Sequence, residues 1–351
     1  MYAPNTPPQP EYWVLSLSGG KDSTALGLEW LKRHQQDPVI YPLHEVIYCD
    51  TGLEFPAMVE HINRLEQIFT GAGIKFTRLK SEKSFEYLMF EYQPKRSNPA
   101  LKDKSGWSWP EPKARWCTEL LKTRVINKYL DDLRNQYSMV QLIGLAADEQ
   151  ARLNREHNQN PEHRHPLVEW SWTEADCLKY CYDAGFDWGG LYDIFNRVSC
   201  WCCPLQSLDE LRKLRKHFPD LWARLLDMEH HTWRTFRADY SVDQLEIRFD
   251  FEEERLAAGL PINRTREFMS ELRKRLEEVG FPQKKKQIGG YKREHLCRAF
   301  EVRNGTGRFE AIGPFRTGRD FQGRDQSVSF REEHPWPGAN QGAGRCYRRD
   351  L

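Results

Sequence analysis

The chain has 351 residues, of which 39% are hydrophobic and 29% charged, and its formal net charge is +1. This composition is typical of a globular protein of one or two domains and excludes collagen-like, mucin-like and wholly disordered chains. Because no apolar run reaches the ~18 residues of a membrane span and the N-terminus lacks a signal-peptide pattern, we expect a cytoplasmic protein without a membrane partner.

The first part of the chain alternates short apolar runs with helical patterns. Strands are predicted at residues 12–17, 45–49, 74–79 and 139–145. Helices are predicted at residues 23–36 and from Pro56 onward, where Met58, Ile62, Leu65 and Phe69 recur at helical spacing. Strands joined through helices imply right-handed crossovers, so we expect an α/β fold with a mostly parallel, doubly wound sheet. Ligands of such sheets bind beyond the carboxyl ends of the strands.

The remainder is expected to be helical around one long loop. Residues 90–112 show no periodicity and indicate a lid-like loop, in which Trp107 and Trp109 either stack on a base or pack the loop itself. Helical patterns occupy residues 117–137, 173–184, 208–217, 219–238, 242–256 and 264–279. We therefore expect a leader at 1–10, an α/β domain at 11–206, a helical appendage at 207–280 and a basic, Gly-rich tail at 281–351.

A glycine turn joins the first predicted strand to the first helix, with the sequence Ser18-Gly19-Gly20-Lys21-Asp22-Ser23. Free backbone N–H groups and the helix dipole favour a phosphate at such a junction. Lys21 adds a point cation, and the glycines and hydroxyls add further donors. The segment is not a Walker A loop, because the spacing G-x-x-x-x-G-K-[ST] is missing. The alternative is an ordinary glycine turn with a helix cap.

Acidic residues also gather at the predicted strand ends, namely Asp22, Asp50, Glu54 and Asp148. Carboxylates beside a polyphosphate repel it unless Mg²⁺ intervenes, so at least one of them should contact this ion. Asp50 and Asp148 are the candidates for metal contact and for a catalytic role beside Lys21. The alternatives are helix capping by Asp22 and an ordinary surface charge at Glu54.

Four cysteines form the second candidate site. Cys200, Cys202 and Cys203 lie in one short segment, and Cys117 follows an Arg-Trp pair earlier in the chain. Such soft ligands suit an iron–sulfur cluster or a tetrahedral Zn²⁺, and in a chain without an export signal they favour metal binding over disulfides. The alternative is a set of buried, unligated thiols. To that alternative we assign Cys49, Cys177, Cys181 and Cys297.

Further motifs follow the glycine turn in order. They are Asp50-Thr51-Gly52-Leu53-Glu54-Phe55-Pro56, Arg115-Trp116-Cys117-Thr118 with Leu121-Lys122, Gly144-Leu145-Ala146-Ala147-Asp148-Glu149 with Arg152, and Ser199-Cys200-Trp201-Cys202-Cys203-Pro204. With Ser-Gly-Gly-Lys-Asp-Ser they resemble the phosphoadenosine phosphosulfate reductase family of the adenine-nucleotide alpha-hydrolase (ATP pyrophosphatase) superfamily. The resemblance covers residues 11–206 and implies a nucleotide-binding domain there.

The resemblance implies a set of ligands. Residues 18–23, with Glu54 and Arg152, would hold the pyrophosphate of ATP or the phospho or sulfate end of phosphoadenosine phosphosulfate, together with Mg²⁺. It favours a [4Fe-4S] cluster on Cys117, Cys200 and Cys203, as in tRNA-thiolating and DNA-phosphorothioating relatives. Whether Cys202 is a fourth ligand, and whether Zn²⁺ replaces the cluster, stays open.

The family's reductases carry a catalytic cysteine near the C-terminus in a Glu-Cys-Gly context, whereas this chain has Arg345-Cys346-Tyr347. We therefore expect adenylation of an acceptor with release of pyrophosphate, linked to sulfur transfer, of which thiolation of a nucleic acid is one form. One alternative is a thiol-dependent reductase that uses Cys346 and releases sulfite. The other is a non-catalytic module that senses the nucleotide.

The tail suggests one class of partner. Residues 281–351 hold 15 Lys and Arg against 8 Asp and Glu, which leaves +7 there and −6 on the rest. Such a tail contacts DNA or RNA phosphates or is merely a solvated surface. A sulfur-donor protein and a second copy of the chain are the other partners considered.

Overall fold

The computed structural model describes residues 9–281, 302–303 and 309–310. The chain divides into two units after Gly290. Within the second unit, β6 (Val302–Arg303) and β7 (Phe309–Glu310) form a short antiparallel pair. Cys297 and Cys346, and nearly all of the predicted basic tail, lie outside the described residues.

A five-stranded sheet organises the first unit. Its strands are β1 (Glu11–Leu17), β2 (Glu45–Asp50), β3 (Lys75–Lys80), β4 (Ser138–Ile143) and β5 (His163–Arg164). Their order is β3-β2-β1-β4-β5, and all four neighbouring pairs are parallel. The predicted α/β fold with a parallel sheet is thereby confirmed. The fifth strand has two residues and was too short to predict from periodicity.

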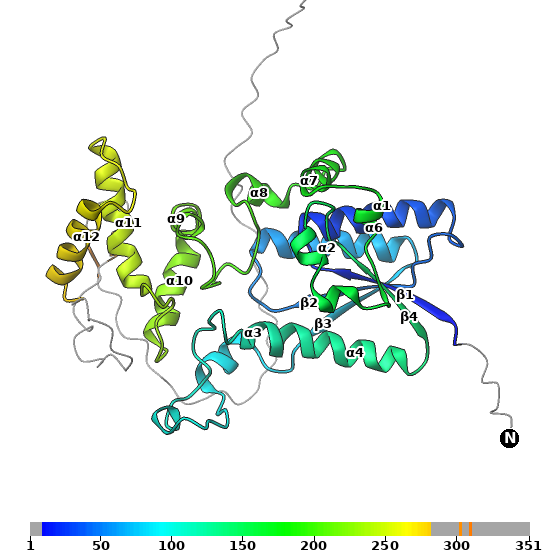
Figure 1. Ribbon diagram of the computed structural model, residues 1–351, viewed down its shortest axis with the longest axis horizontal. Helices are drawn as coiled ribbons and strands as arrows, with labels where there is room; N and C mark the ends of the chain where they lie inside the picture. Colours follow the sequence, from blue (N-terminus) through cyan, green and yellow to red (C-terminus); the bar gives the residue numbers. More distant parts are fainter. Residues whose placement is uncertain (1–8, 282–301, 304–308, 311–351) are drawn as a thin grey trace, which may run out of the picture. The chain divides into compact units, whose positions relative to one another are not determined.

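Helices cover both faces of the sheet (Figure 1). On one face, α1 (Lys21–Gln36) and α2 (Pro56–Gly71) bury the strand residues Leu15 and Leu17 in the larger apolar core. On the other, α4 (Arg124–Arg134) covers Val14 and Ile47. Adjacent residues of β1 thus point to opposite faces, as the period of two in a strand requires. Both faces are apolar, which explains why these strands read as nearly continuous hydrophobic runs.

The remaining helices are mostly short as far as α8 and longer beyond it. They are α3 (Trp116–Thr118), α5 (Gln150–Leu153), α6 (Pro166–Glu169), α7 (Glu174–Asp183), α8 (Leu191–Ile194), α9 (Leu208–His217), α10 (Pro219–His230), α11 (Val242–Ala257) and α12 (Arg266–Glu278). The 3₁₀ turns are η2 (Pro99–Leu101), η4 (Glu156–Gln159) and η5 (Trp188–Gly190), and the π turns are η1 (Tyr87–Glu91) and η3 (Glu119–Thr123). None of the described helices is long and apolar enough to span a membrane.

The helix predicted at residues 219–238 ends earlier, at His230. The buried carboxylate of Glu229 accepts hydrogen bonds from the backbone amides of Phe236 and Val242, which folds residues 231–241 into a tight turn. Burial, opposed by these hydrogen bonds, raises the pKa of Glu229 to about 7.

The predicted lid-like loop is anchored at its C-terminal part. Trp109 is fully buried, and its ring meets Phe236 edge-on at a centroid distance of 4.9 Å. The Ser108 hydroxyl accepts hydrogen bonds from the Thr232 hydroxyl at 2.6 Å and the Arg234 amide at 3.1 Å. Trp109 therefore packs the protein core, and its buried ring cannot stack on a base.

Candidate functional site

The glycine turn lies at the topological switch point of the sheet. In the order β3-β2-β1-β4-β5, the chain leaves β1 and β4 toward opposite sides, and the crevice between such strand ends is the usual ligand site. The end of β4 lies against the first turn of α1 here, because a Cβ atom on Gly144 would lie 2.7 Å from Cα of Ser23. Residues 18–23 and 144–149 thus share one edge of the sheet.

The turn itself is specified by a glycine and a serine. Gly19 has φ +80°, and a Cβ atom there would lie 2.8 Å from Cδ1 of Ile62 and 2.9 Å from the Met58 sulfur, so only glycine fits. The Ser23 hydroxyl closes the turn, since it lies 2.9 Å from the Ser18 hydroxyl and accepts from the Ser18 amide at 3.2 Å. We call residues 18–23 the phosphate loop.

Residues from α7 onward hold the phosphate loop from behind. The Trp188 indole donates to the Gly19 carbonyl at 2.8 Å, and the Lys21 amide donates to the Tyr192 hydroxyl at 3.0 Å. The Cys181 thiol lies 3.5 Å from the Lys21 carbonyl. These contacts fix the loop, and they also mean that the Lys21 amide already has a partner.

Three carboxylates surround Lys21. One ligand oxygen each of Asp22, Glu149 and Glu174 lies within 4.8 Å of the others. The Lys21 ammonium is 2.9 Å from Oε2 of Glu174 and 3.6 Å from Oδ2 of Asp22. Burial, opposed by Lys21 and reinforced by Glu174 and Glu149, raises the pKa of Asp22 to about 6. We call these three side chains the carboxylate trio.

The carboxylate trio fits a hard divalent cation. Oδ1 of Asp22 is buried and has no hydrogen-bond partner among the described residues. Three carboxylate oxygens at this spacing are the donors that Mg²⁺ prefers, and a cation would relieve their mutual repulsion. Lys21 and Arg152 supply two positive charges against the three negative ones, so one bound cation would balance the site.

The predicted acidic residues occupy different places. Asp148 accepts from the Glu174 amide at 3.1 Å and so positions a member of the carboxylate trio. Asp50 accepts from the Gly52 amide at 2.7 Å and lies 3.6 Å from Lys80. Glu54 accepts from the Thr51 hydroxyl at 2.6 Å. The predicted Arg152 pairs with Glu149.

Glu149 and Glu174 were missed as site residues by the sequence reasoning. Glu149 directly follows Asp148 in the quoted motif, so its neighbourhood was identified but not its role. Glu174 is the first residue of α7 and lies within the capping box formed by Thr173 and Asp176. Its approach to Lys21 depends on how α7 packs against α1, for which the sequence holds no local signal.

The four predicted cysteines come together in space. The pKa of Cys202 is raised well above its usual range by burial and by the neighbouring thiols of Cys200, Cys203 and Cys117. Cys202 is 2% exposed, whereas the other three are half-buried. The Trp201 amide donates to the Leu53 carbonyl at 3.2 Å, which ties the cysteine turn to the loop after β2. The cysteines therefore lie at the same edge of the sheet as the phosphate loop.

The described thiols do not form a preassembled site for a single ion. No three of the described cysteines have sulfur atoms within 4.8 Å of one another. Tetrahedral zinc with Zn–S bonds of ~2.3 Å needs sulfur atoms about 3.8 Å apart. Cys49, Cys177 and Cys181 are buried elsewhere, in agreement with their assignment as structural thiols.

Lys122 links the two candidate sites. It lines a cavity of about 140 Å³ together with residues of β1, β2 and the phosphate loop, among them Ser18 and Cys49. Burial raises the pKa of the Cys200 thiol, and the positive charge of Lys122 opposes that shift. Lys122 makes no ion pair with any described carboxylate. A cation therefore stands between the phosphate loop and the cysteines, free to meet an anion.

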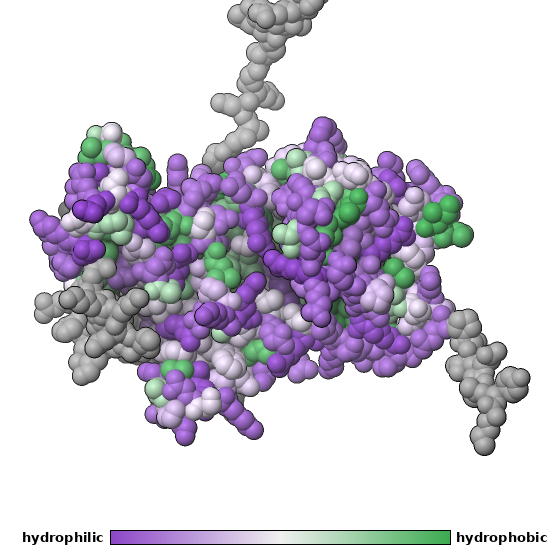
Figure 2. Space-filling model, viewed as in Figure 1, coloured by the Kyte–Doolittle hydropathy of each residue, from purple (hydrophilic) through white to green (hydrophobic). Residues whose placement is uncertain are grey.

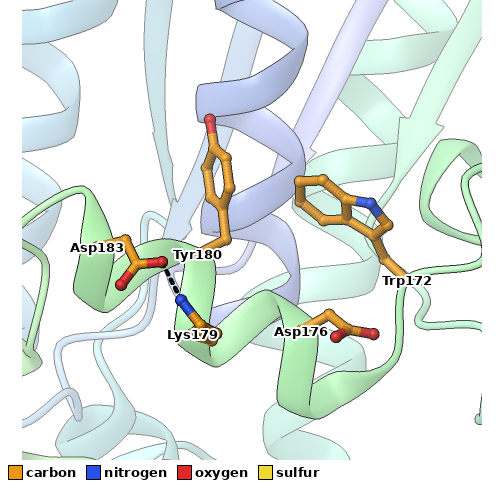
Figure 3. Close-up of a pocket in the computed structure, with 5 residues that line it drawn as sticks. All are labelled: Trp172, Asp176, Lys179, Tyr180 and Asp183. Carbon is orange, nitrogen blue, oxygen red and sulfur yellow. Dashed lines mark hydrogen bonds and ion pairs between the residues drawn. The ribbon is translucent and has the colours of Figure 1, made fainter. Parts of the chain in front are cut away.

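A larger hollow of about 360 Å³ lies over α7, outside this edge of the sheet. Figure 3 shows that its Lys179 points to Asp183, with which it forms an ion pair, while Tyr180 points away toward α1. The Tyr180 hydroxyl donates to Glu29 at 3.1 Å. Because its polar groups are paired with one another, this hollow offers little to a ligand.

Both candidate sites fall inside one family match. Residues 12–206, more than half of the chain, match the phosphoadenosine phosphosulfate reductase domain. The chain belongs to this family. The resemblance drawn from the motifs is thereby confirmed, and the phosphate loop, the carboxylate trio, Lys122 and all four predicted cysteines belong to the family domain. Residues from α9 onward lie outside the match.

Relatives of this family member extend well beyond the shared segment. Uncharacterized protein MJ0066 of Methanocaldococcus jannaschii is 25% identical over 217 residues, which are 60% of this chain and 40% of that protein. Uncharacterized protein MJ0973 of the same organism is 26% identical over 218 residues, which are 61% and 46% of the two chains. The matched segments thus cover less than half of either relative.

A solved structure aligns over a similar share of the chain. The U34-tRNA thiolase NcsA from Methanococcus maripaludis, solved with its [4Fe-4S] cluster, shows 13% identity and a TM-score of 0.34. The alignment covers 70% of this chain and 74% of that one.

Proposed function

We propose that this member of the phosphoadenosine phosphosulfate reductase family is an ATP-dependent enzyme that adenylates an acceptor in preparation for sulfur transfer. Family membership supports a nucleotide-dependent, sulfur-related function. The choice of ATP chemistry over reduction of a sulfonucleotide goes further and rests on the carboxylate trio.

The carboxylate trio supports the proposal because it lies beside Lys21, in the loop to which we assign the anion. Even with Lys21 and Arg152 counted, the trio keeps a net negative charge, which disfavours a free sulfonucleotide, whereas a metal-bound polyphosphate brings its own cation. Breaking the bond between the α- and β-phosphates of ATP requires such a cation to neutralise the leaving pyrophosphate. Transfer of a sulfo group to a thiol has no comparable need, so the trio favours ATP.

In the proposed reaction, an acceptor oxygen forms a bond to the α-phosphorus while the bond to the bridging oxygen breaks. The bonding electron pair leaves on pyrophosphate, and the acceptor proton passes to solvent. Asp22, Glu149 and Glu174 would hold Mg²⁺, which when bound neutralises charge on the phosphate oxygens. Burial opposes protonation of Lys21, but the hydrogen bond to Glu174 and the charge of Asp22 raise its pKa, so it acts as a fixed cation.

The four cysteines are assigned to the sulfur-transfer step of the proposed reaction. Cys117, Cys200 and Cys203 would hold an iron–sulfur cluster, which when bound with one open iron supplies a site for sulfide. Cys202 is the most deeply buried of the four thiols, which favours a supporting place behind the cluster. Lys122 would attract the anionic species that passes between the two sites.

The test is pyrophosphate release from ATP and Mg²⁺ by anaerobically purified protein, with transfer RNA or DNA as acceptor. Glu149→Gln should abolish release, because it removes one charge from the carboxylate trio without changing side-chain shape. Asp183→Asn is the matched control, since Asp183 pairs with Lys179 on the outer face of α7. Release of sulfite from phosphoadenosine phosphosulfate, without pyrophosphate from ATP, would contradict the proposal and favour the reductase.

A further inference from the structure

An anchored segment projects next to the cysteines. Residues 93–115, which we call the insertion, leave the body beyond η1 and return at α3, as seen in the cyan part of Figure 1. Trp109 and Ser108 fix it to the turn after α10. The Trp116 indole donates to the Ser108 carbonyl at 3.0 Å, and the Trp233 indole donates to the Ser105 carbonyl at 3.0 Å. The insertion is thus held at several points along its length.

The charge of the insertion is strongly positive. It contains six Lys and Arg residues against Asp103 and Glu111. Glu111 is already paired with Arg234 at 3.0 Å. The exposed lysines are Lys95, Lys102, Lys104 and Lys113. None of these lysines forms an ion pair with a carboxylate of the described residues, whereas Arg215 on α9 alone contacts three carboxylates. The insertion therefore presents cations that the protein itself does not neutralise.

The positive charge of the insertion extends to the neighbourhood of the cysteines. Arg115, the last residue of the insertion, is exposed and stands two positions before Cys117. Arg197, which is also exposed, stands three positions before Cys200. An anionic chain lying on the insertion would therefore follow a run of cations to the thiols.

The surface chemistry favours a nucleic acid among anionic partners. A membrane surface would call for exposed apolar side chains beside the cations, and none of the large exposed hydrophobic residues of the described ranges belongs to the insertion. Over the viewed side of the described residues, hydrophobic side chains are scattered among hydrophilic ones (Figure 2). Trp233 adds an aromatic ring under the guanidinium groups of Arg96 and Arg234, at 5.2 and 4.9 Å. Cations interleaved with half-buried aromatics are typical of nucleic-acid surfaces.

We propose that the insertion binds the phosphate backbone of a nucleic-acid strand and leads that strand to the cysteine site. This inference rests on the proposed function, because it names the acceptor of the proposed reaction as a nucleic acid. The surface of the insertion does not include the phosphate loop. Either proposal can therefore fail while the other holds.

The test compares two variants of the full chain that lose the same charge. In the insertion variant, Lys95, Lys102, Lys104 and Lys113 are each changed to Gln. In the control variant, the exposed Lys32, Lys128, Lys216 and Lys274 are changed to Gln. Binding of fluorescent DNA and RNA oligonucleotides is measured by anisotropy between about 50 and 200 mM salt, where phosphate contacts strongly affect affinity.

The insertion variant should bind at least about tenfold more weakly and show a shallower salt dependence, by about 0.7 in log–log slope per lost contact on a single strand. The control variant should bind like the original protein. Both variants should keep the affinity for ATP, so a failure of ATP binding or turnover would count against the proposed function only.

Equal affinity of the two variants, or no oligonucleotide binding by the original protein at low salt, would overturn the inference. Polyglutamate or anionic vesicles bound as tightly as oligonucleotides, with the same loss in the insertion variant, would overturn it in favour of an acidic protein or a membrane.

Discussion

The ammonium nitrogen of Lys21 lies 2.9 Å from Oε2 of Glu174, a residue 153 positions further along the chain. Lys21, the cation of the phosphate loop, is therefore already paired with a carboxylate when no phosphate is bound. A nucleotide without metal must displace this carboxylate or tolerate its charge, whereas a metal-bound nucleotide can use both groups.

Glu174→Gln should consequently have opposite effects with and without Mg²⁺. In a chelator, the variant should bind ATP more tightly than the original protein, because a repelling charge is gone and Lys21 is released. With Mg²⁺, binding and pyrophosphate release should both weaken, because one ligand is lost. Calorimetry under the two conditions measures the reversal. Weakening in both conditions would show that Glu174 contributes only to structure.

Lys21→Ala should weaken nucleotide binding by about 1.5–3 kcal/mol, the usual range for hydrogen bonds to a charged group. Lys179→Ala is the matched control, because that lysine also pairs with a carboxylate but on the outer face of α7. Its nucleotide affinity should not change. Unchanged affinity in Lys21→Ala would remove the phosphate loop from the nucleotide site.

The cysteine site is expected to give a brown protein when it is purified without oxygen. Cys200→Ser and Cys203→Ser should lose iron, because a hydroxyl is a hard and weakly acidic substitute for a soft thiolate. Cys177→Ala should keep its iron, since that thiol is buried in the core beside α1. Iron and sulfide analysis of the original protein and the variants tests this prediction. Stoichiometric zinc in place of iron would indicate a structural zinc site.

Lys122→Met should lower pyrophosphate or sulfur transfer by at least about tenfold while leaving the fold intact, because it removes the unpaired cation between the two sites. Lys128→Met on the exposed side of α4 changes the charge equally and should have no effect. Lys122→Arg should recover part of the activity, since it restores the charge. If Lys122→Met is as active as the original protein, the anion does not bind at Lys122.

His61 should make stability depend on pH. Its ring lies behind the phosphate loop, 3.0 Å from the Thr24 hydroxyl, and burial, followed by Arg64, lowers its pKa to about 4. An unfolded His61 binds a proton below its ordinary pKa of about 6.5, whereas the folded one stays neutral until about 4. The contribution of neutral His61 to the free energy of unfolding is therefore complete above about pH 6.5 and is lost as the pH falls toward 4.

Urea unfolding of the original protein and His61→Asn at two pH values isolates this contribution. The stability difference between them should shrink by about 2 kcal/mol from pH ~7.5 to pH ~5, since each pKa unit corresponds to 1.36 kcal/mol. Parallel pH dependences of the two proteins would mean that His61 has the same pKa in the folded and the unfolded state.

The strand, glycine turn and helix that contain the phosphate loop could be predicted because their determinants are local. An apolar run, two glycines and a helical pattern follow one another within residues 12–36, and the structure has β1, the turn and α1 there. The cysteine set could be predicted for a similar reason, since a short segment supplies three of its members. The resemblance to a family then connected the fourth, Cys117.

Other features depend on contacts between distant segments and could not be predicted. Glu174 reaches Lys21 because α7 packs on α1, through contacts such as that of Tyr180 with Glu29, 151 residues apart. The early end of α10 depends on which amides Glu229 meets after folding. The anchoring of Trp109 likewise requires Phe236, which lies beyond the family domain. Hydrophobic periodicity contains no information about such pairings.

The contact of Trp109 with Phe236 also bears on how this protein can be dissected. The family match ends at residue 206. Trp109 lies inside the matched segment, yet it is covered by Phe236, which lies thirty positions beyond the end of that segment. A fragment cut at the family boundary would expose a large indole and release Ser108 from its two donors. Recombinant fragments and chimaeras should therefore keep the chain at least through α11, because homology and autonomous folding have different limits here.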